Sequence, residues 1–501
     1  MRKLGVGWGI ALWFFAGCNG DRQGNAITST TGVGGAGDTS PAGAAGAGGD
    51  TGAAGTGVDT GGTGSGGTGG GSMPSARGCS DLFDAATLVD YSFDISADEW
   101  AKIDYEFRNR DALKAAGIDY KPYHPIVFHY GGETVTDAMV RLKGDSSWVI
   151  TVRDDGDKAK MQFVVSFEEV NPAGKFHGVS KIVLDMPSSD PTFLQERLGF
   201  TTMAEIFGLP APCANSARVT INGQYYGLYV SEEHVGGGYI RRVFPEAPAG
   251  DLWEGGWSPK TNEAMPNDAK IDAFWAAHDV ASMSAVVDMQ YSVTEWAAEA
   301  LLNDADGYYG GAHNFYLYDY ADKGYRWLLD DADATFGWIG RSDTSPIYWW
   351  AGRGTTQDAG QHYLIVMADP TWRANYIAAL RQLLALWDVG RVQGWVDAFS
   401  AQIEDSVEHD PHRLDTMDQH RAAVAEMKQT VADRPNYIAR FLACEDGSGD
   451  ASDADGDGFA WCNDCDDGNP AVSPGAVEIC GNGIDDNCNR YADAQDGCPA
   501  M

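Results

Sequence analysis

The sequence has few basic residues for its length. Its 501 residues include 35 Lys and Arg against 72 Asp and Glu, which gives a formal net charge of -37 at pH 7. Because proteins hold nucleic-acid phosphates with Lys and Arg, this balance argues against a nucleic-acid partner. It favours divalent cations as ligands and a soluble body exposed to solvent.

Long apolar runs are also scarce. The run at residues 4–15 is too short to span a bilayer as a stable helix, and it follows a basic start, as in a secretory signal peptide. The segment ending at Cys18 resembles a bacterial lipobox, with Phe15 where Leu is usual. We therefore expect residues 1–18 to be a lipoprotein signal peptide and the exported chain to be lipid-anchored at the cell envelope or surface through Cys18. The alternative is an ordinary signal peptide with a chance cysteine.

Aromatic residues are absent from residues 19–78, where Gly, Ala, Thr and Ser dominate. Such a segment cannot bury a core and is expected to be a flexible linker. A folded body should occupy residues 79–443. Residues 445–501 then form a tail with fourteen acidic residues and one Arg, which needs covalent or metal staples to fold. Eight cysteines remain after Cys18 is set aside, and in an exported chain they suggest disulfides.

Strand-like runs come first in the body and helical runs later. This order predicts an α+β fold. The strongest short signal is Asn222-Gly223 between two apolar runs, which is typical of a β-hairpin. The expected strands are 91–95, 126–130, 134–142, 162–167, 181–185, 218–221 and 224–230, and the expected helices are 193–207, 370–386, 390–408 and 412–443.

The segment 294–338 organises the rest of the body. A helix ending near Asn303 is followed by an acidic loop, and residues 315–320 and 325–329 form a second predicted hairpin. The start of its first strand and the end of its second strand lie side by side. The hairpin should therefore bring together polar residues on both sides of it: Asp304, Asp306, Asn314, Asp330, Asp331 and Asp333.

Crowded carboxylates raise each other's pKa because like charges repel one another. A bound metal ion removes the free-energy cost of this repulsion. Mg²⁺ favours one or two carboxylates plus phosphate oxygens. The order Asp, Asn, hairpin, Asp near Phe-Gly is also the order found in protein kinases. The alternative is an acidic loop that is simply solvated or stiffened by Ca²⁺.

Several motifs of the body, taken in order, resemble the CotH family of spore-coat-protein-H-like atypical kinases. They span roughly residues 88–340 and include RLKGD from Arg141, Lys160 before MQFVVSF, DPTFLQER from Asp190, GLPAP from Gly208, INGQYYGLYVSEEH from Ile221, DGY from Asp306, HN at His313 and DADATFG from Asp331. The chain departs from the family at Asp330, where Trp is usual. Its interval from Asp306 to Asn314 is also longer than in ordinary protein kinases.

The resemblance implies an atypical protein-kinase-like body that uses ATP and Mg²⁺ or Mn²⁺ to phosphorylate Ser or Thr of surface proteins. Asp306 would be the catalytic base. Asn314 and Asp331 would bind the metal, with Asp333 as a second candidate. Lys160 would contact phosphate oxygens and Glu196 would orient it, unless Lys160 is a solvated lysine at a strand start and Glu196 lies on a solvated helix face. Lys143 is a further candidate for nucleotide contact, with a surface charge as the alternative.

The sequence has no GxxxxGK[ST] phosphate loop, and no GxGxxG pattern lies close before Lys160, where the nearest glycines are Gly144 and Gly156. The expectation of nucleotide binding therefore rests on the resemblance. The other class of function is a non-catalytic surface-binding or adhesion module that keeps the fold.

The tail contains a second metal-binding pattern. Asp453, Asp455 and Asp457 occupy positions one, three and five of an EF-hand-like loop, and Asp464 falls at position twelve. This spacing predicts Ca²⁺, and the repeated acidic and Cys-containing segments resemble the MopE-type metal-binding repeat. A stapled acidic tail without metal is the alternative. Cys462-x-x-Cys465 could indicate Zn²⁺, but a disulfide role fits an exported chain better.

Overall fold

The computed structural model describes residues 73–74, 77–144, 160–336 and 360–449, and in the tail 452–462, 464, 466–480, 484 and 486–488. The expected signal peptide with Cys18, and almost all of the expected linker, lie outside these residues. No helix within the described ranges is both long and apolar enough to cross a membrane.

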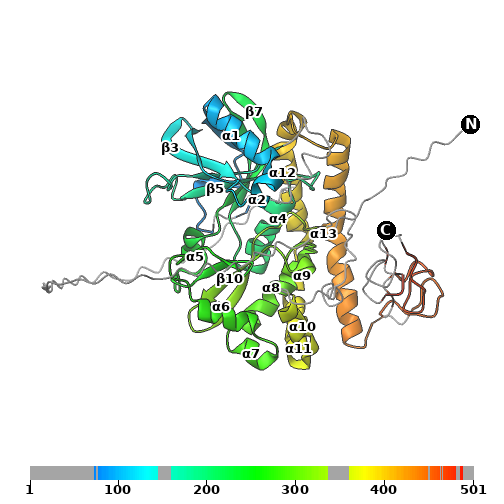
Figure 1. Cartoon of the computed structure of the whole chain (residues 1–501). Helices are drawn as coiled ribbons and strands as arrows, with labels where there is room; N and C mark the ends of the chain where they lie inside the picture. The colour runs from blue at the N-terminus through cyan, green and yellow to red at the C-terminus, as the bar shows by residue number, and fades with distance from the viewer. Residues whose placement is uncertain are drawn as a thin grey trace, which may run out of the picture. The chain divides into compact units, whose positions relative to one another are not determined.

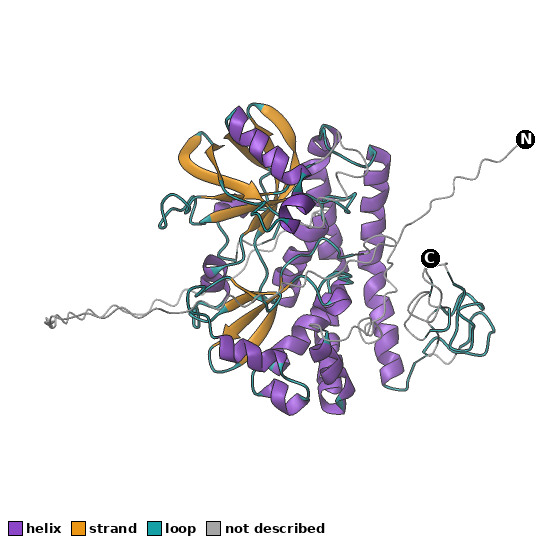
Figure 2. Ribbon diagram, viewed as in Figure 1, coloured by secondary structure: helices purple, strands orange, loops and turns teal. Residues whose placement is uncertain are grey.

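The first half of the body is a closed seven-stranded β-barrel with the strand order β1-β2-β3-β4-β5-β7-β6 (Figures 1 and 2). Neighbouring strands are antiparallel except β1 and β6, whose parallel pairing closes the barrel. The strands are β1 (Val89–Asp94), β2 (His124–Tyr130), β3 (Glu133–Leu142), β4 (Phe163–Ser166), β5 (Lys181–Asp185), β6 (Ala214–Ile221) and β7 (Gln224–Glu233).

Alternating side chains of these strands fill the barrel, as the period of two in a strand requires. Val89, Tyr91 and Phe93 of β1 are buried, while residues between them are more exposed. β4 is buried at all four positions. Two helices, α1 (Ala97–Arg108) and α2 (Arg110–Ala115), connect β1 to β2 and cover the core with Ile103 and Phe107.

The predicted hairpin at Asn222-Gly223 is confirmed. Asn222 has φ 50° and Gly223 φ 76°. Positive φ at both central residues is the geometry of a type I′ turn, whose twist matches that of the flanking strands. The turn therefore sets the pairing of β6 with β7.

A short 3₁₀ helix, η1 (Asp81–Phe83), precedes the barrel, and α4 (Gln195–Thr202) follows β5. The sequence predicts one helix over 193–207, but α4 begins at Gln195 and passes into a π-helical turn, η2 (Met203–Phe207). Gly208 ends it in the left-handed conformation with φ 70°, as predicted.

The second half combines helices with a four-stranded sheet of order β11-β10-β8-β9. The predicted hairpin is present as β10 and β11. The elements are α5 (Gly237–Val243), β8 (Leu252–Glu254), β9 (Ser258–Pro259), α6 (Asp268–Trp275), α7 (Val280–Ser284), α8 (Met289–Leu302), α9 (Tyr308–Gly311), β10 (Phe315–Tyr320), β11 (Gly324–Leu329), α10 (Gln361–Ala368), α11 (Pro370–Leu384), α12 (Val389–Glu408) and α13 (Met417–Glu445).

The core of this half contains Trp296 of α8, Trp327 of β11 and Trp395 of α12, all fully buried. Helix α12 packs against β7, α4 and α13, so it attaches the helical half to the barrel (Figure 1). Strands come first and helices later, which confirms the predicted α+β class. Closure into a barrel was not predicted, because it depends on the pairing of two strands that lie far apart in the sequence.

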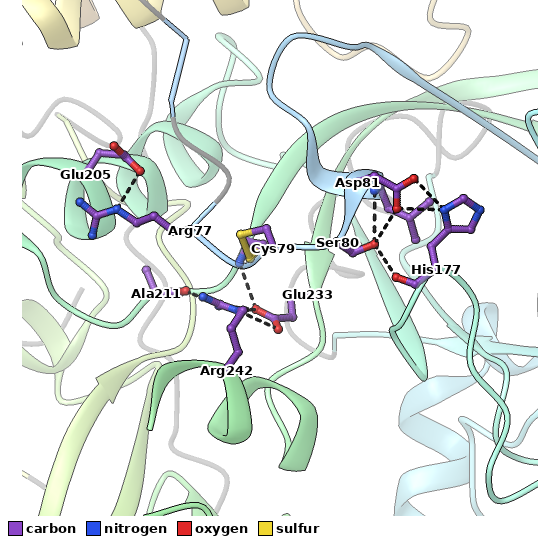
Figure 3. The surroundings of a disulfide bond; sticks show 11 residues. Arg77, Cys79, Ser80, Asp81, His177, Glu205, Ala211, Glu233 and Arg242 are labelled. Atoms are coloured by element: carbon purple, nitrogen blue, oxygen red, sulfur yellow. Dashed lines mark hydrogen bonds and ion pairs between the residues drawn. A yellow bond between two sulfur atoms is a disulfide. The ribbon is translucent and has the colours of Figure 1, made fainter. Parts of the chain in front are cut away.

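Disulfides secure both ends of the described body. Cys79 is bonded to Cys213, just before β6, and Figure 3 shows salt bridges on the two sides of this bond, Arg77 with Glu205 and Arg242 with Glu233. Cys444, in the last turn of α13, is bonded to Cys462 of the tail. The expected disulfide role of Cys462 is therefore confirmed, and the alternative of a Zn²⁺ ligand is wrong.

Candidate functional site

The polar residues on both sides of the β10–β11 hairpin meet at its open end, as predicted. Phe315 pairs with Leu329, and the next residues continue the contact, because the Asp330 backbone N–H donates to the Asn314 carbonyl at 3.1 Å. The side-chain amide of Asn314 donates to Asp306 Oδ2 at 3.2 Å. The loop before the hairpin and the segment after it thus form one polar site.

Two buried carboxyl groups hold the loop that carries Asp306. Asp304 Oδ1 accepts from the backbone N–H groups of Asp306 at 3.2 Å and Gly307 at 2.9 Å. Glu299 Oε2, from α8, accepts from the Tyr309 N–H at 2.6 Å. A Cβ on Gly307 would lie 2.5 Å from Asp304 Oδ2, so only glycine fits this close approach. Asp306 itself remains half-buried.

The segment after β11 is fastened to α4. Gln195 Nε2 donates to the Thr335 carbonyl at 2.7 Å, and the Thr335 hydroxyl donates to the Gln195 carbonyl at 3.2 Å. A Cβ on Gly199 would lie only 2.7 Å from Ala332 Cβ, which shows how tightly the two segments pack. Because Glu196 follows Gln195, this packing brings its carboxyl group into electrostatic contact with Asp331.

The barrel contributes the other side of the site. Lys143 follows β3 and forms an ion pair with Asp185 at the end of β5, and Gln162 also donates to Asp185. Asp185, Glu196 and Glu232 are buried, and one carboxylate oxygen from each lies within 4.8 Å of the others. Lys143 remains 27% exposed. Strand ends and the first turn of α4 therefore place one lysine among several carboxylates.

Burial and mutual repulsion raise the pKa values of the acidic groups in this site. The pKa of Glu196 is raised by burial and by the charges of Glu232 and Asp331. Burial, with Glu254 and Asp331, raises the pKa of Asp330 to about 8. The pKa of Asp333 rises through burial and through Asp331 and Asp306. Lys143 offsets part of this repulsion in all three groups.

The same carboxylates also change the pKa of Lys143. Burial lowers its pKa, but the carboxylates of Glu232, Asp331, Glu196 and Asp330 outweigh burial, and the net shift is upward. Lys143 therefore stays protonated at neutral pH. The site thus combines a fixed cation with a cluster of oxygen donors, which is an arrangement suited to a divalent metal and to phosphate groups.

The expected pairing of Lys160 with Glu196 is wrong. Lys160 Nζ donates to Asp410 Oδ2 and to the Leu228 carbonyl, both at 2.6 Å. The two side chains of this ion pair are 2% and 0% exposed. Burial lowers the pKa of Lys160, and Asp410 partly restores it. Lys160 thus joins the barrel to the loop after α12, whereas Lys143 lies near Glu196.

Two residues of the site have no role in the sequence-based prediction, Asp185 and Glu232. Asp185 ends a predicted strand, and Glu232 follows another apolar run beside Glu233. The alternation of a strand could have separated the buried Glu232 from Glu233, which pairs with Arg242. Asp410 had no local signal, since its partner Lys160 is 250 residues away.

The acidic residues of the tail also come together. Asp455, Asp457 and Asp464 offer carboxylate oxygens within 4.8 Å of one another, and Asp453, Asp455 and Asp467 form a second such group. Asp453 accepts from the backbone N–H groups of Gly456 at 2.7 Å and Gly458 at 2.9 Å, which closes the predicted loop. Asp467 was not among the metal ligands that the sequence predicted for the tail. Either group could hold a metal ion.

Comparison with known proteins finds two family models that match different parts of the chain. A family model described as a putative metal-binding motif, of the MopE type, matches residues 464–494. No curated protein matches the chain. A family model described as CotH kinase protein matches residues 140–438, more than half of the chain, and includes Lys143, Glu196, Asp306 and Asp331. The protein therefore belongs to the CotH kinase protein family.

Proposed function

We propose that the body is an atypical protein kinase, with a kinase-like arrangement of barrel and helical half, that transfers phosphate from ATP to Ser or Thr of surface proteins. The observation that supports this best is the convergence of Lys143, Glu196, Asp306, Asn314 and Asp331 from four separate segments. Phosphoryl transfer needs positioning and charge neutralisation more than covalent chemistry, and this set can supply both.

In this proposal Lys143 takes the role that the sequence assigned to Lys160. It is protonated, partly exposed and surrounded by carboxylates. The charges of Glu196 and Lys143 act on each other, and in this proposal Glu196 would help to orient the lysine beside its ion pair with Asp185. Lys160 is engaged with Asp410 and serves to hold the barrel and the helical half together.

Asn314, Asp331 and Asp333 would hold Mg²⁺ or Mn²⁺. Their oxygen donors fit a hard cation, and the raised pKa of Asp333 reflects repulsion from Asp331 and Asp306, beyond the effect of burial, that such a cation would relieve. A bound ion would neutralise phosphate charge. The residues of the chain provide the fixed geometry around it.

Asp306 would accept the proton of the substrate hydroxyl. Its carboxylate is half-buried and receives the Asn314 amide at Oδ2, which fixes its orientation. Its backbone N–H is held by the buried Asp304. A base held this way can act without rearrangement of the loop.

The remaining parts fit a protein exported from a bacterial cell. Cys18 would carry the lipid, the linker would hold the body away from the membrane, and the tail would bind Ca²⁺ through Asp453, Asp455, Asp457 and Asp464. These assignments are supported by the sequence patterns and by the convergence of the tail carboxylates.

The test is ATP binding to the purified chain with and without Mg²⁺, followed by phosphate transfer to a surface-protein extract. We expect metal-dependent binding of ATP. A chain that binds no nucleotide under either condition is better described as a surface-binding module that keeps the fold.

A further inference from the structure

We propose that Asp185, Glu196 and Glu232 form a second divalent-cation site, on the barrel side, separate from the site of Asn314 and Asp331. The three residues come from three different elements: Asp185 ends β5, Glu196 lies in the first turn of α4, and Glu232 lies near the end of β7. Their carboxylate oxygens nevertheless lie within 4.8 Å of one another.

The geometry points to a ligand because two of these carboxylates are incompletely satisfied. Glu196 and Glu232 are 4% and 5% exposed, and Oε1 of each lacks a hydrogen-bond partner among the described residues. A buried polar atom without a partner costs free energy that water can no longer offset. Asp185 differs, since Gln162 and Lys143 occupy its two oxygens.

The charges of the site also call for a further cation. The charges of Glu232 and Asp331 raise the pKa of Glu196, and the charge of Asp331 also raises the pKa of Glu232. Lys143 supplies a single positive charge and already pairs with Asp185. A divalent ion between Glu196 and Glu232 would neutralise both and satisfy their unpaired oxygens.

The donor set selects the class of ion. The unpaired oxygens of Glu196 and Glu232 are its main ligands, and Asp185 can add a third only through a remaining lone pair of an oxygen that already accepts a hydrogen bond. A set of oxygen ligands suits Mg²⁺ or Mn²⁺ and leaves coordination positions open. If the proposed function holds, phosphate oxygens of the nucleotide would fill those positions. Binding of the ion to the protein alone does not rest on the proposed function.

The test counts Mn²⁺ ions bound to the full chain without nucleotide, by electron paramagnetic resonance of free Mn²⁺ during titration. The variants are Glu232→Gln and Asp331→Asn, each of which removes one negative charge. Asp137→Asn is the matched control, because Asp137 is an exposed residue of β3 and belongs to none of the acidic groups that could hold a metal among the described residues.

We expect Glu232→Gln to bind one Mn²⁺ fewer than the wild type, Asp331→Asn to keep that ion, and Asp137→Asn to bind as the wild type does. Ions bound by the tail contribute equally to every variant and cancel in the comparison. An unchanged count in Glu232→Gln overturns the proposal. Two separate sites require that the double variant, Glu232→Gln with Asp331→Asn, bind two Mn²⁺ fewer than the wild type. A loss of only one ion from the double variant also overturns the proposal, since one shared site would then explain the data.

Thermal melting gives a second measurement and shows whether each variant folds. In EDTA, Glu232→Gln should show a single cooperative melting transition like that of the wild type, which establishes that the variant folds. Added Mn²⁺ should then raise its melting temperature less than that of the wild type. An equal rise in both proteins contradicts the site. Failure of ATP to bind a wild-type protein that still takes up this ion would contradict the kinase function alone.

Discussion

The side-chain amide of Asn314 donates a hydrogen bond to the carboxylate of Asp306 at 3.2 Å. One of these residues is the proposed base and the other a proposed metal ligand. They are joined across a loop whose backbone is held by Asp304 and Glu299. The same loop therefore positions the proposed base and a proposed metal ligand, although the two have different chemical roles.

Those roles can be separated by substitution. Asp331→Ala should abolish metal-dependent ATP binding, because the phosphates lose a neutralising ion. Asp306→Ala should leave ATP binding nearly unchanged and lower the rate of transfer about 10²–10⁴-fold, the usual cost of losing a general base. Nucleotide titration and a phosphotransfer assay on the same preparations measure the two effects.

Asp322→Asn is a suitable control for both variants, since Asp322 lies in the exposed turn of the same hairpin. It should bind ATP and transfer phosphate as the wild type does. If Asp306→Ala and Asp331→Ala retain wild-type transfer, the hairpin is not the site of catalysis.

The two lysines should respond differently to replacement by methionine. Lys143→Met is expected to weaken ATP binding by about 10- to 100-fold, which corresponds to about 1.5–3 kcal/mol for a charged hydrogen bond. Lys160→Met leaves Asp410 buried without its cation and should lower the free energy of unfolding by about 3–5 kcal/mol. ATP titration and denaturant unfolding distinguish the two outcomes.

The contrast between the lysines excludes a simple alternative. If Lys160→Met weakened ATP binding while leaving the free energy of unfolding unchanged, Lys160 would be the nucleotide residue after all. Lys143 would then be only a charge at the edge of the acidic cluster.

Local patterns predicted the elements of this fold better than their assembly. The turn at Asn222-Gly223 and the β10–β11 hairpin have strong short-range signals, so the meeting of Asp306, Asn314 and Asp331 followed from sequence. Closure of the barrel through β1 and β6 did not, because no neighbouring residue encodes that pairing.

The partners of the lysines were missed for the same reason. Asp410 and Lys160 approach each other only once α12 packs on β7. Likewise, Lys143 reaches Asp185 through strands β3, β4 and β5, whose register is fixed by the whole barrel. A lysine before a strand could therefore be recognised as important, but its role could not be assigned.

Cys18 lies outside the described residues, and its lipidation is a prediction from sequence. Cys18→Ser should move the protein from the membrane fraction to the soluble fraction, because the thiol that would carry the lipid is lost. Fractionation followed by immunoblotting measures this, and Asn25→Ser, a change within the expected linker, is the control that should stay with the membrane. A Cys18→Ser protein that still sediments with membranes would show that the anchor lies elsewhere.

The tail should become resistant to protease when Ca²⁺ binds. Oδ2 of Asp455, Asp457 and Asp464 is buried and without a hydrogen-bond partner among the described residues, so a cation would satisfy three oxygens together. In the oxidised full chain, Ca²⁺ should slow cleavage within residues 445–501 as its concentration approaches about 10⁻⁴–10⁻³ M, the range of weak extracellular sites. Mass spectrometry of the fragments locates the cleavage.

Asp455 is the most informative residue to substitute in this test, because it belongs to both acidic groups of the tail. Asp455→Asn should remove most of the protection, whereas Asp466→Asn should keep it, since Asp466 is exposed and outside both groups. The two variants have the same net charge, so a difference between them reflects ligation and not the general attraction of cations to an acidic tail. Equal protection in both variants, or none in the wild type at millimolar Ca²⁺, would contradict a Ca²⁺ site built on this loop.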